Sequence, residues 1–140
     1  MTPPTLIVID VQRAFDDPSW GERNNPGAGR RIAHAIAGWR ERGAPLIHVH
    51  HRSAEPQGSF VPDTDAFEFK PEAQPLDGEP IITKDVNSAF IGTDATFARR
   101  TPDGELIAAD DIHRVELASL HDEFAEVLST EAALARLDAS

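Results

Sequence analysis

The pattern of hydrophobic and polar positions in the first half of the chain predicts a strand, a helix and a second strand. Residues 5–10, TLIVID, are a continuous apolar run that ends in an acid, as in a strand buried inside a parallel sheet. Apolar side chains recur at helical spacing through residues 32–39, and we expect the preceding Asn25–Pro26 pair to cap and begin that helix. Residues 45–51, PLIHVHH, complete a βαβ unit, whose crossover is almost always right-handed.

A long loop and a third strand follow this unit. Residues 52–79 are rich in proline and contain two glycines. Loops of this length in compact domains usually serve as functional lids or insertions. Residues 80–84, PIITK, then form a short apolar strand that ends in a lysine.

The C-terminal third has a weaker pattern. We expect residues 95–105, ATFARRTPDGE, to form a loop and residues 110–121 to form a helix. A strand near residues 125–128 and a last helix capped by Ser129 or Thr130 complete the prediction. In the alternative, the first helix continues through the predicted strand.

Composition restricts the class of protein. The 140 residues suit one domain, residues 1–140, and 40% hydrophobic with 26% charged residues is typical of a globular protein. A net charge of −11 argues against binding to nucleic acid or an anionic membrane. No signal pattern precedes the first strand and no apolar run could span a bilayer, so we expect a cytoplasmic protein.

Asp10 and Lys84 are the strongest candidates for chemistry, because each ends a predicted strand. In open α/β sheets, ligands gather beyond the carboxyl ends of the strands. A carboxyl group there suits a general acid or base, and a lysine beside it can stabilise negative charge. Alternatively, Asp10 caps the next turn and Lys84 protects a sheet edge. If both act together, their charged groups should lie within salt-bridge reach, about 4 Å.

The three histidines of the second strand are weaker candidates. His48 and His50 share one face of the predicted strand, and His51 lies on the other. A metal site needs a third ligand and an open position, and no accompanying motif supplies them. The pattern therefore favours partly buried strand histidines and predicts no metal site.

Two motifs and the C-terminal segment resemble the isochorismatase-like cysteine hydrolases. The motifs are LIVIDVQRAF, residues 6–15, and IITKDVNSAFIGTD, residues 81–94, and the similar C-terminal segment covers residues 94–130. The likeness extends over nearly the whole chain. It implies an α/β, doubly wound Rossmann-like fold with a six-stranded parallel sheet ordered 3-2-1-4-5-6.

The resemblance also implies a site and a reaction. Asp10 would be the base that activates a cysteine thiol, and Lys84 would orient and stabilise it. The substrate-binding residues would be Gln12, Phe15 and Phe90. The implied substrate is a small amide or carbamoyl compound, or a vinyl ether in a branch that lacks the cysteine. No metal or organic cofactor is implied, and homo-oligomers are common in the family.

The chain departs from the family pattern between Asp94 and Ala95. It contains no cysteine, and the block that would carry strands 4 and 5 is missing, roughly 30 residues or more. The first interpretation is that the sequence is an incomplete record of a full hydrolase. The others are a truncated, catalytically dead relative that acts as an interaction module, and a hydrolase that needs no cysteine. Without strands 4 and 5, residues 5–10 would form an apolar sheet edge, which another chain should cover.

Overall fold

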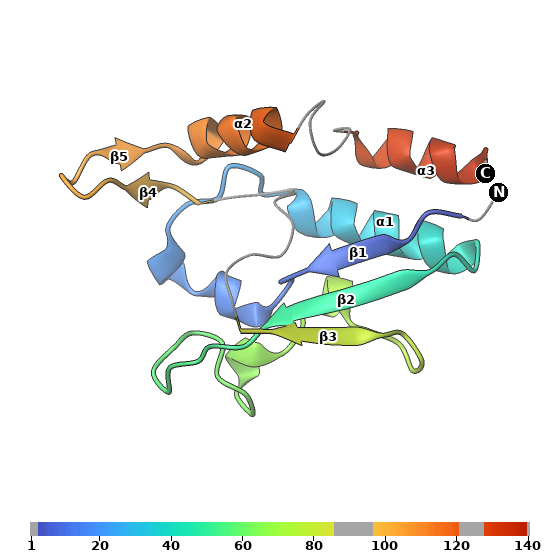
Figure 1. Ribbon diagram of the computed structural model, residues 1–140, viewed down its shortest axis with the longest axis horizontal. Helices are drawn as coiled ribbons and strands as arrows, with labels where there is room; N and C mark the ends of the chain where they lie inside the picture. The colour runs from blue at the N-terminus through green and yellow to red at the C-terminus, as the bar shows by residue number, and fades with distance from the viewer. Residues whose placement is uncertain (1–2, 86–96, 121–127, 140) are drawn as a thin grey trace.

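The computed structural model of the protein describes residues 3–85, 97–120 and 128–139 (Figure 1). Strands and α-helices follow in the order β1 (Leu6–Ile9), α1 (Ala28–Glu41), β2 (Leu46–His51), β3 (Ile81–Lys84), β4 (Arg99–Arg100), β5 (Leu106–Ile107), α2 (Ala109–Leu120) and α3 (Thr130–Asp138). Four short 3-10 helices lie between them: η1 (Arg13–Asp16), η2 (Pro18–Trp20), η3 (Asp65–Phe67) and η4 (Pro71–Ala73).

The first three strands form a parallel sheet in the order β1-β2-β3. They lie side by side and point the same way (Figure 1). The register pairs Leu6 with Leu46 and His51 with Lys84. This arrangement confirms the predicted βαβ unit and third strand. It corresponds to the 3-2-1 half of the expected strand order.

Helix α1 packs on the sheet because its apolar stripe faces the strands. Ile36 lies in one core cluster with Val8 of β1 and Leu46 of β2. The predicted start of this helix is wrong, because the residue that caps it is Gly27. The Asn25 side chain instead accepts a hydrogen bond from the Gly27 N–H at 3.3 Å, so it forms the turn before the helix.

Helix α3 packs on α1, so the C-terminal segment belongs to the same fold (Figure 1). Leu137 is buried against Trp39 of α1. The two helices approach closely at Gly38, where an added Cβ would lie 2.4 Å from Leu134. Ser129 caps α3 by accepting a hydrogen bond from the Ala132 N–H, which confirms that prediction.

Helix α2, Ala109–Leu120, agrees with the predicted helix of residues 110–121 as far as the described residues extend. Ser129 has an extended backbone, so a continuous helix from Asp110 through Ser129 does not form. Most of the predicted strand at residues 125–128 lies outside the described residues.

Two details of the sheets differ from the sequence prediction. Strand β1 is less buried than its apolar sequence suggests, since Ile7 is 43% exposed. β1 is the terminal strand of the described sheet, which accounts for this exposure. The predicted loop at residues 95–105 also contains strand β4, which pairs with β5 in an antiparallel hairpin. Gly104, with φ of +92°, makes the turn possible.

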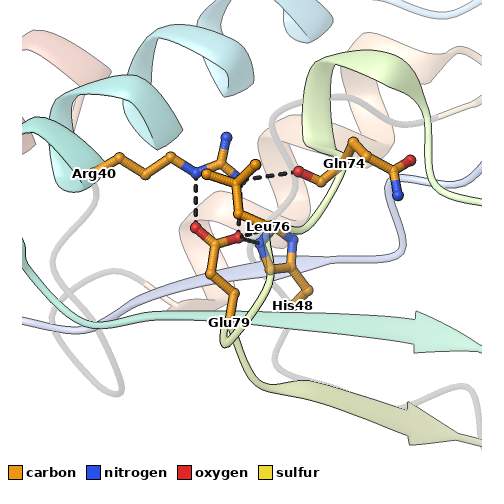
Figure 2. Close-up of polar contacts among 5 residues, drawn as sticks. All are labelled: Arg40, His48, Gln74, Leu76 and Glu79. Carbon is orange, nitrogen blue, oxygen red and sulfur yellow. Dashed lines mark hydrogen bonds and ion pairs between the residues drawn. The ribbon is translucent and has the colours of Figure 1, made fainter.

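A polar network ties β2 to α1 and to the loop before β3 (Figure 2). The Glu79 carboxylate accepts two hydrogen bonds from the Arg40 guanidinium, at 2.7 and 2.8 Å. It accepts a third from the Leu76 N–H at 2.9 Å and a fourth from Nε2 of the fully buried His48 at 2.8 Å. These contacts, the Arg40 hydrogen bond above all, hold the pKa of Glu79 at about 2, below its ordinary 4.5.

This network predicts an acid-sensitive fold. Because the pKa of Glu79 is depressed in the folded state, its contribution is present above pH 4.5 and is lost as pH falls toward 2. We expect Glu79→Gln to lower the free energy of unfolding at pH 7 by about 3 kcal/mol and to flatten its dependence on pH below 4.5. Urea denaturation at several pH values measures both effects. Glu55→Gln, at an exposed position, should change neither.

Candidate active site

Asp10 is placed by a sharp turn at the end of β1. Its backbone lies in the left-handed region, with φ of +57°, which is uncommon for a residue other than glycine. The Asp10 N–H donates to the Val49 carbonyl, and the Asp10 carbonyl accepts from the Gln12 N–H at 2.9 Å. The chain therefore stays tied to β2 up to Asp10 and then turns away. Strained backbone of this kind is often found at functional sites.

Lys84 is the last residue of β3 and forms the predicted ion pair. Its Nζ lies 2.7 Å from Oδ2 of Asp10. Both side chains are largely shielded from water, at 10% and 24% exposure. The predicted convergence of the two residues is therefore confirmed. The second carboxylate oxygen, Oδ1, is buried and has no hydrogen-bond partner in the described structure.

His51 is a member of this cluster that the sequence analysis did not select. It ends β2, the strand between β1 and β3, and its Nδ1 lies 3.4 Å from Nζ of Lys84. The signal was present in the strand periodicity, because His51 lies on the opposite face from His48 and His50. The register that pairs His51 with Lys84 decides the contact, and it could not be derived from periodicity.

Gln12 joins the ends of two strands to the long loop. Its side chain is fully buried. Nε2 donates to the carbonyls of His51 and Phe67, at 3.0 and 2.8 Å, and Oε1 accepts from the His51 N–H at 2.8 Å. The amide is therefore occupied by backbone groups. A direct role in substrate binding stays a prediction.

An aromatic cluster lies beside the charged residues. The Phe15 ring packs against Trp20, Phe60 and Phe97, with centroids 5.0 to 5.7 Å apart. Phe60 in turn meets the His51 ring edge to face at 5.1 Å. Phe15 is thus connected to the site through Phe60. Phe90, the remaining predicted substrate-binding residue, lies outside the described residues, as does the Asp94–Ala95 junction.

The other two strand histidines have packing roles. His48 belongs to the Glu79 network. His50 stacks on Phe69 and hydrogen-bonds to the Thr83 hydroxyl, and burial lowers its pKa. In the segments that the structure describes, His, Asp and Glu side chains form no group of three or more that could hold a metal ion.

Comparison with known proteins identifies the family. Residues 4–101 match the family model of the isochorismatase domain. The chain belongs to the isochorismatase family of hydrolases. The uncharacterized isochorismatase family protein YrdC of Bacillus subtilis (strain 168) is 34% identical over 90% of this chain and 91% of its own length.

Solved structures of isochorismatase-family proteins share the fold. One from Chromobacterium violaceum ATCC 12472 has a TM-score of 0.90 at 33% identity and covers 99% of this chain and 95% of its own. An isochorismatase from Pseudomonas putida KT2440 has a TM-score of 0.74 at 25% identity, covering 91% of this chain and 88% of its own. The predicted α/β fold class is thereby confirmed. The alternative of an interaction module gains no support.

The alignment with the Bacillus subtilis protein is longer than this chain. It spans 171 positions, of which this chain fills about 126 (90% of 140), so about 45 positions belong to the relative alone. This difference is consistent with a block that is missing from the present sequence. Within the described segments, none of the helices has the length and hydrophobicity that a membrane-spanning helix needs.

The hydrogen bonds of Gln12 predict a large effect on stability. Gln12→Leu would leave the His51 N–H and two carbonyls without partners in a buried place. We expect the free energy of unfolding to fall by about 3 kcal/mol. Urea denaturation measures it, and Gln57→Leu at an exposed position serves as the control. Equal stability of the two variants would contradict the assigned role of Gln12.

Proposed function

We propose that the protein hydrolyses a small substrate that carries an amide, carbamoyl or vinyl-ether group, with Asp10 as the proton-transfer residue. The observation that supports this most is the largely shielded Asp10–Lys84 ion pair at the carboxyl edge of the sheet. One carboxylate oxygen is held by the ammonium, and the buried Oδ1 has no partner in the described structure. An unpaired oxygen there is suited to exchange a proton with water or substrate.

For an amide or carbamoyl substrate, water is the nucleophile in this proposal, because the chain contains no cysteine. Asp10 Oδ1 accepts a proton from a water molecule while the water oxygen attacks the carbonyl carbon. The Lys84 ammonium stabilises the negative charge that develops on the carbonyl oxygen. Asp10 then returns the proton to the leaving nitrogen as the C–N bond breaks.

For a vinyl ether, the same two residues support a different order of events. A protonated Asp10 gives its proton to the terminal carbon of the double bond, which leaves an oxocarbenium ion. Water adds to the cationic carbon and gives a proton to the Asp10 carboxylate, which restores the protonated acid. The resulting hemiketal breaks into a ketone and an alcohol. Neither route requires a metal or an organic cofactor, and the two differ in their products.

The surroundings of the pair suit a small and partly apolar substrate. In this proposal Phe15 and Phe90 line the substrate pocket, and Phe60 links Phe15 to His51. Gln12 contributes by fixing the end of β2 and, through it, the position of His51. We place this reaction in the cytoplasm.

The proposal predicts that Asp10→Asn abolishes hydrolysis. The purified protein is incubated with a panel of amides, carbamoyl compounds and vinyl ethers, and released ammonia or ketone is measured. We expect Asp10→Asn and Lys84→Met each to lower kcat by about 100-fold or more. An Asp10→Asn variant with wild-type activity would exclude the assigned role.

Two matched controls are available for these variants. Asp63→Asn changes the other non-glycine residue with a left-handed backbone among those described, with φ of +64°, at an exposed position. Lys70→Met removes the chain's other lysine, which is buried and paired with Asp16 instead of Asp10. Neither control should lower kcat by more than about 3-fold, since neither side chain contacts the Asp10–Lys84 pair.

We also propose that the protein is a homo-oligomer in which a second copy covers β1. In the described structure β1 pairs with β2 alone, and Ile7 is exposed on it. Light scattering should give a molecular mass that is a multiple of 15.3 kDa, the mass of one chain. Ile7→Glu should lower the measured mass to that of one chain. Ile107→Glu, an exposed position on β5, is the control. A wild-type mass of 15.3 kDa would contradict this arrangement.

A further inference from the structure

The Lys84 ammonium touches an imidazole as well as a carboxylate. Its Nζ lies 2.7 Å from Oδ2 of Asp10 and 3.4 Å from Nδ1 of His51. We propose that His51 is a positioning residue: its Nδ1 holds the Lys84 ammonium against Asp10. This inference rests on the proposed function, because it concerns the same pair of residues.

The chemistry of the contact fixes the form of His51. An ammonium group can only donate hydrogen bonds, so Nδ1 must accept and cannot carry a proton. His51 is therefore the neutral imidazole with its proton on Nε2. A protonated His51 would place a second cation beside Lys84 and would remove the acceptor that holds it.

The geometry of the sheet explains why Lys84 needs such support. Lys84 ends β3 and Asp10 follows β1, so two strand spacings, about 10 Å, separate their backbones. The side chain of Lys84 must cross the end of β2, where His51 lies. A flexible lysine loses conformational freedom when its ammonium is fixed in one place, and a second acceptor at that ammonium, Nδ1 of His51, helps to offset this cost.

His51 is itself held in place on several sides. Its N–H and carbonyl both bond to the Gln12 amide. Its ring meets the Phe60 ring at an angle of 89°, and β2 and β3 pair it directly with Lys84. The ring therefore occupies a defined place from which Nδ1 can fix the ammonium.

In the described part of the chain, the charged groups near the His51 ring lie at the ends of β1, β2 and β3. Lys84 approaches from β3 and Asp10 from β1. Arg52 and Asp85, the residues next to the ends of β2 and β3, pair with each other at 3.3 Å. Gln12 and Phe60, which also contact His51, do not titrate. Protonation of His51 should consequently weaken the site, because it would remove the acceptor of the Lys84 ammonium.

Kinetics of three variants test the inference. His51→Leu removes the acceptor and should lower kcat by about 10- to 100-fold, with little change in KM. His51→Asn can place its Oδ1 where Nδ1 lies but cannot be protonated. It should keep kcat within about 3-fold of wild type and lose any decrease in rate that protonation of the imidazole causes. His50→Asn, on the neighbouring histidine that stacks on Phe69, should retain the wild-type pH profile.

A spectroscopic measurement needs no substrate and covers the case in which His51→Leu does not fold. In long-range ¹H–¹⁵N spectra at pH 8, we expect the His51 Nδ1 resonance of an unprotonated nitrogen. Lys84→Met should shift it and Lys70→Met should not. Asp10→Asn with full activity would overturn the proposed function instead. An unchanged His51 resonance in Lys84→Met would overturn the role of His51 alone. A kcat of His51→Asn as low as that of His51→Leu would do the same.

Discussion

The ion pair between Asp10 and Lys84 depends on a lysine side chain that spans the end of an intervening strand. Parallel strands bring their carboxyl ends to one edge, but β1 and β3 are not neighbours. The pair therefore requires a turn at Asp10 that brings its carboxylate toward Lys84, and a fixed place for the Lys84 ammonium at the end of β2. The left-handed backbone of Asp10 provides the first condition. The Nδ1 of His51 provides the second.

Both conditions require that β2 stay fixed, and the structure secures this strand at two places. Near its middle, His48 joins the network of Glu79 and Arg40, which connects β2 to α1. At its end, the Gln12 amide bonds to both backbone groups of His51. Buried polar groups of this kind cost free energy unless every partner is in place. The bonds that are made oppose a shift of β2, which would move His51 and with it the ion pair, whereas Nδ1 of His48 is buried without a hydrogen-bond partner in the described structure.

The parts of the fold that sequence patterns predicted are those that local chemistry determines. The hydrophobic pattern alone was sufficient to predict three elements. These are the strand before Asp10, the helix around Ile36 and the strand that ends at Lys84. The convergence of Asp10 and Lys84 followed from parallel topology alone. The role of His51 did not, because it depends on the register between β2 and β3. The hairpin of β4 and β5 was also missed, because strands of two residues are too short to show an alternating pattern.

The same topology explains how a chain without cysteine can keep Asp10 and Lys84 together. Asp10, Gln12, His51 and Lys84 all lie within the first three strands or directly after them. Their hydrogen bonds and their ion pair are made within this part of the sheet. In the family pattern, the cysteine lies on a later block, at the end of a fourth strand. The given sequence lacks the cysteine of that pattern, yet it contains the groups that hold Asp10 and Lys84 together. Oδ1 of Asp10 is buried and has no hydrogen-bond partner in the described structure, so this part of the sheet keeps one carboxylate oxygen that the described protein groups do not occupy.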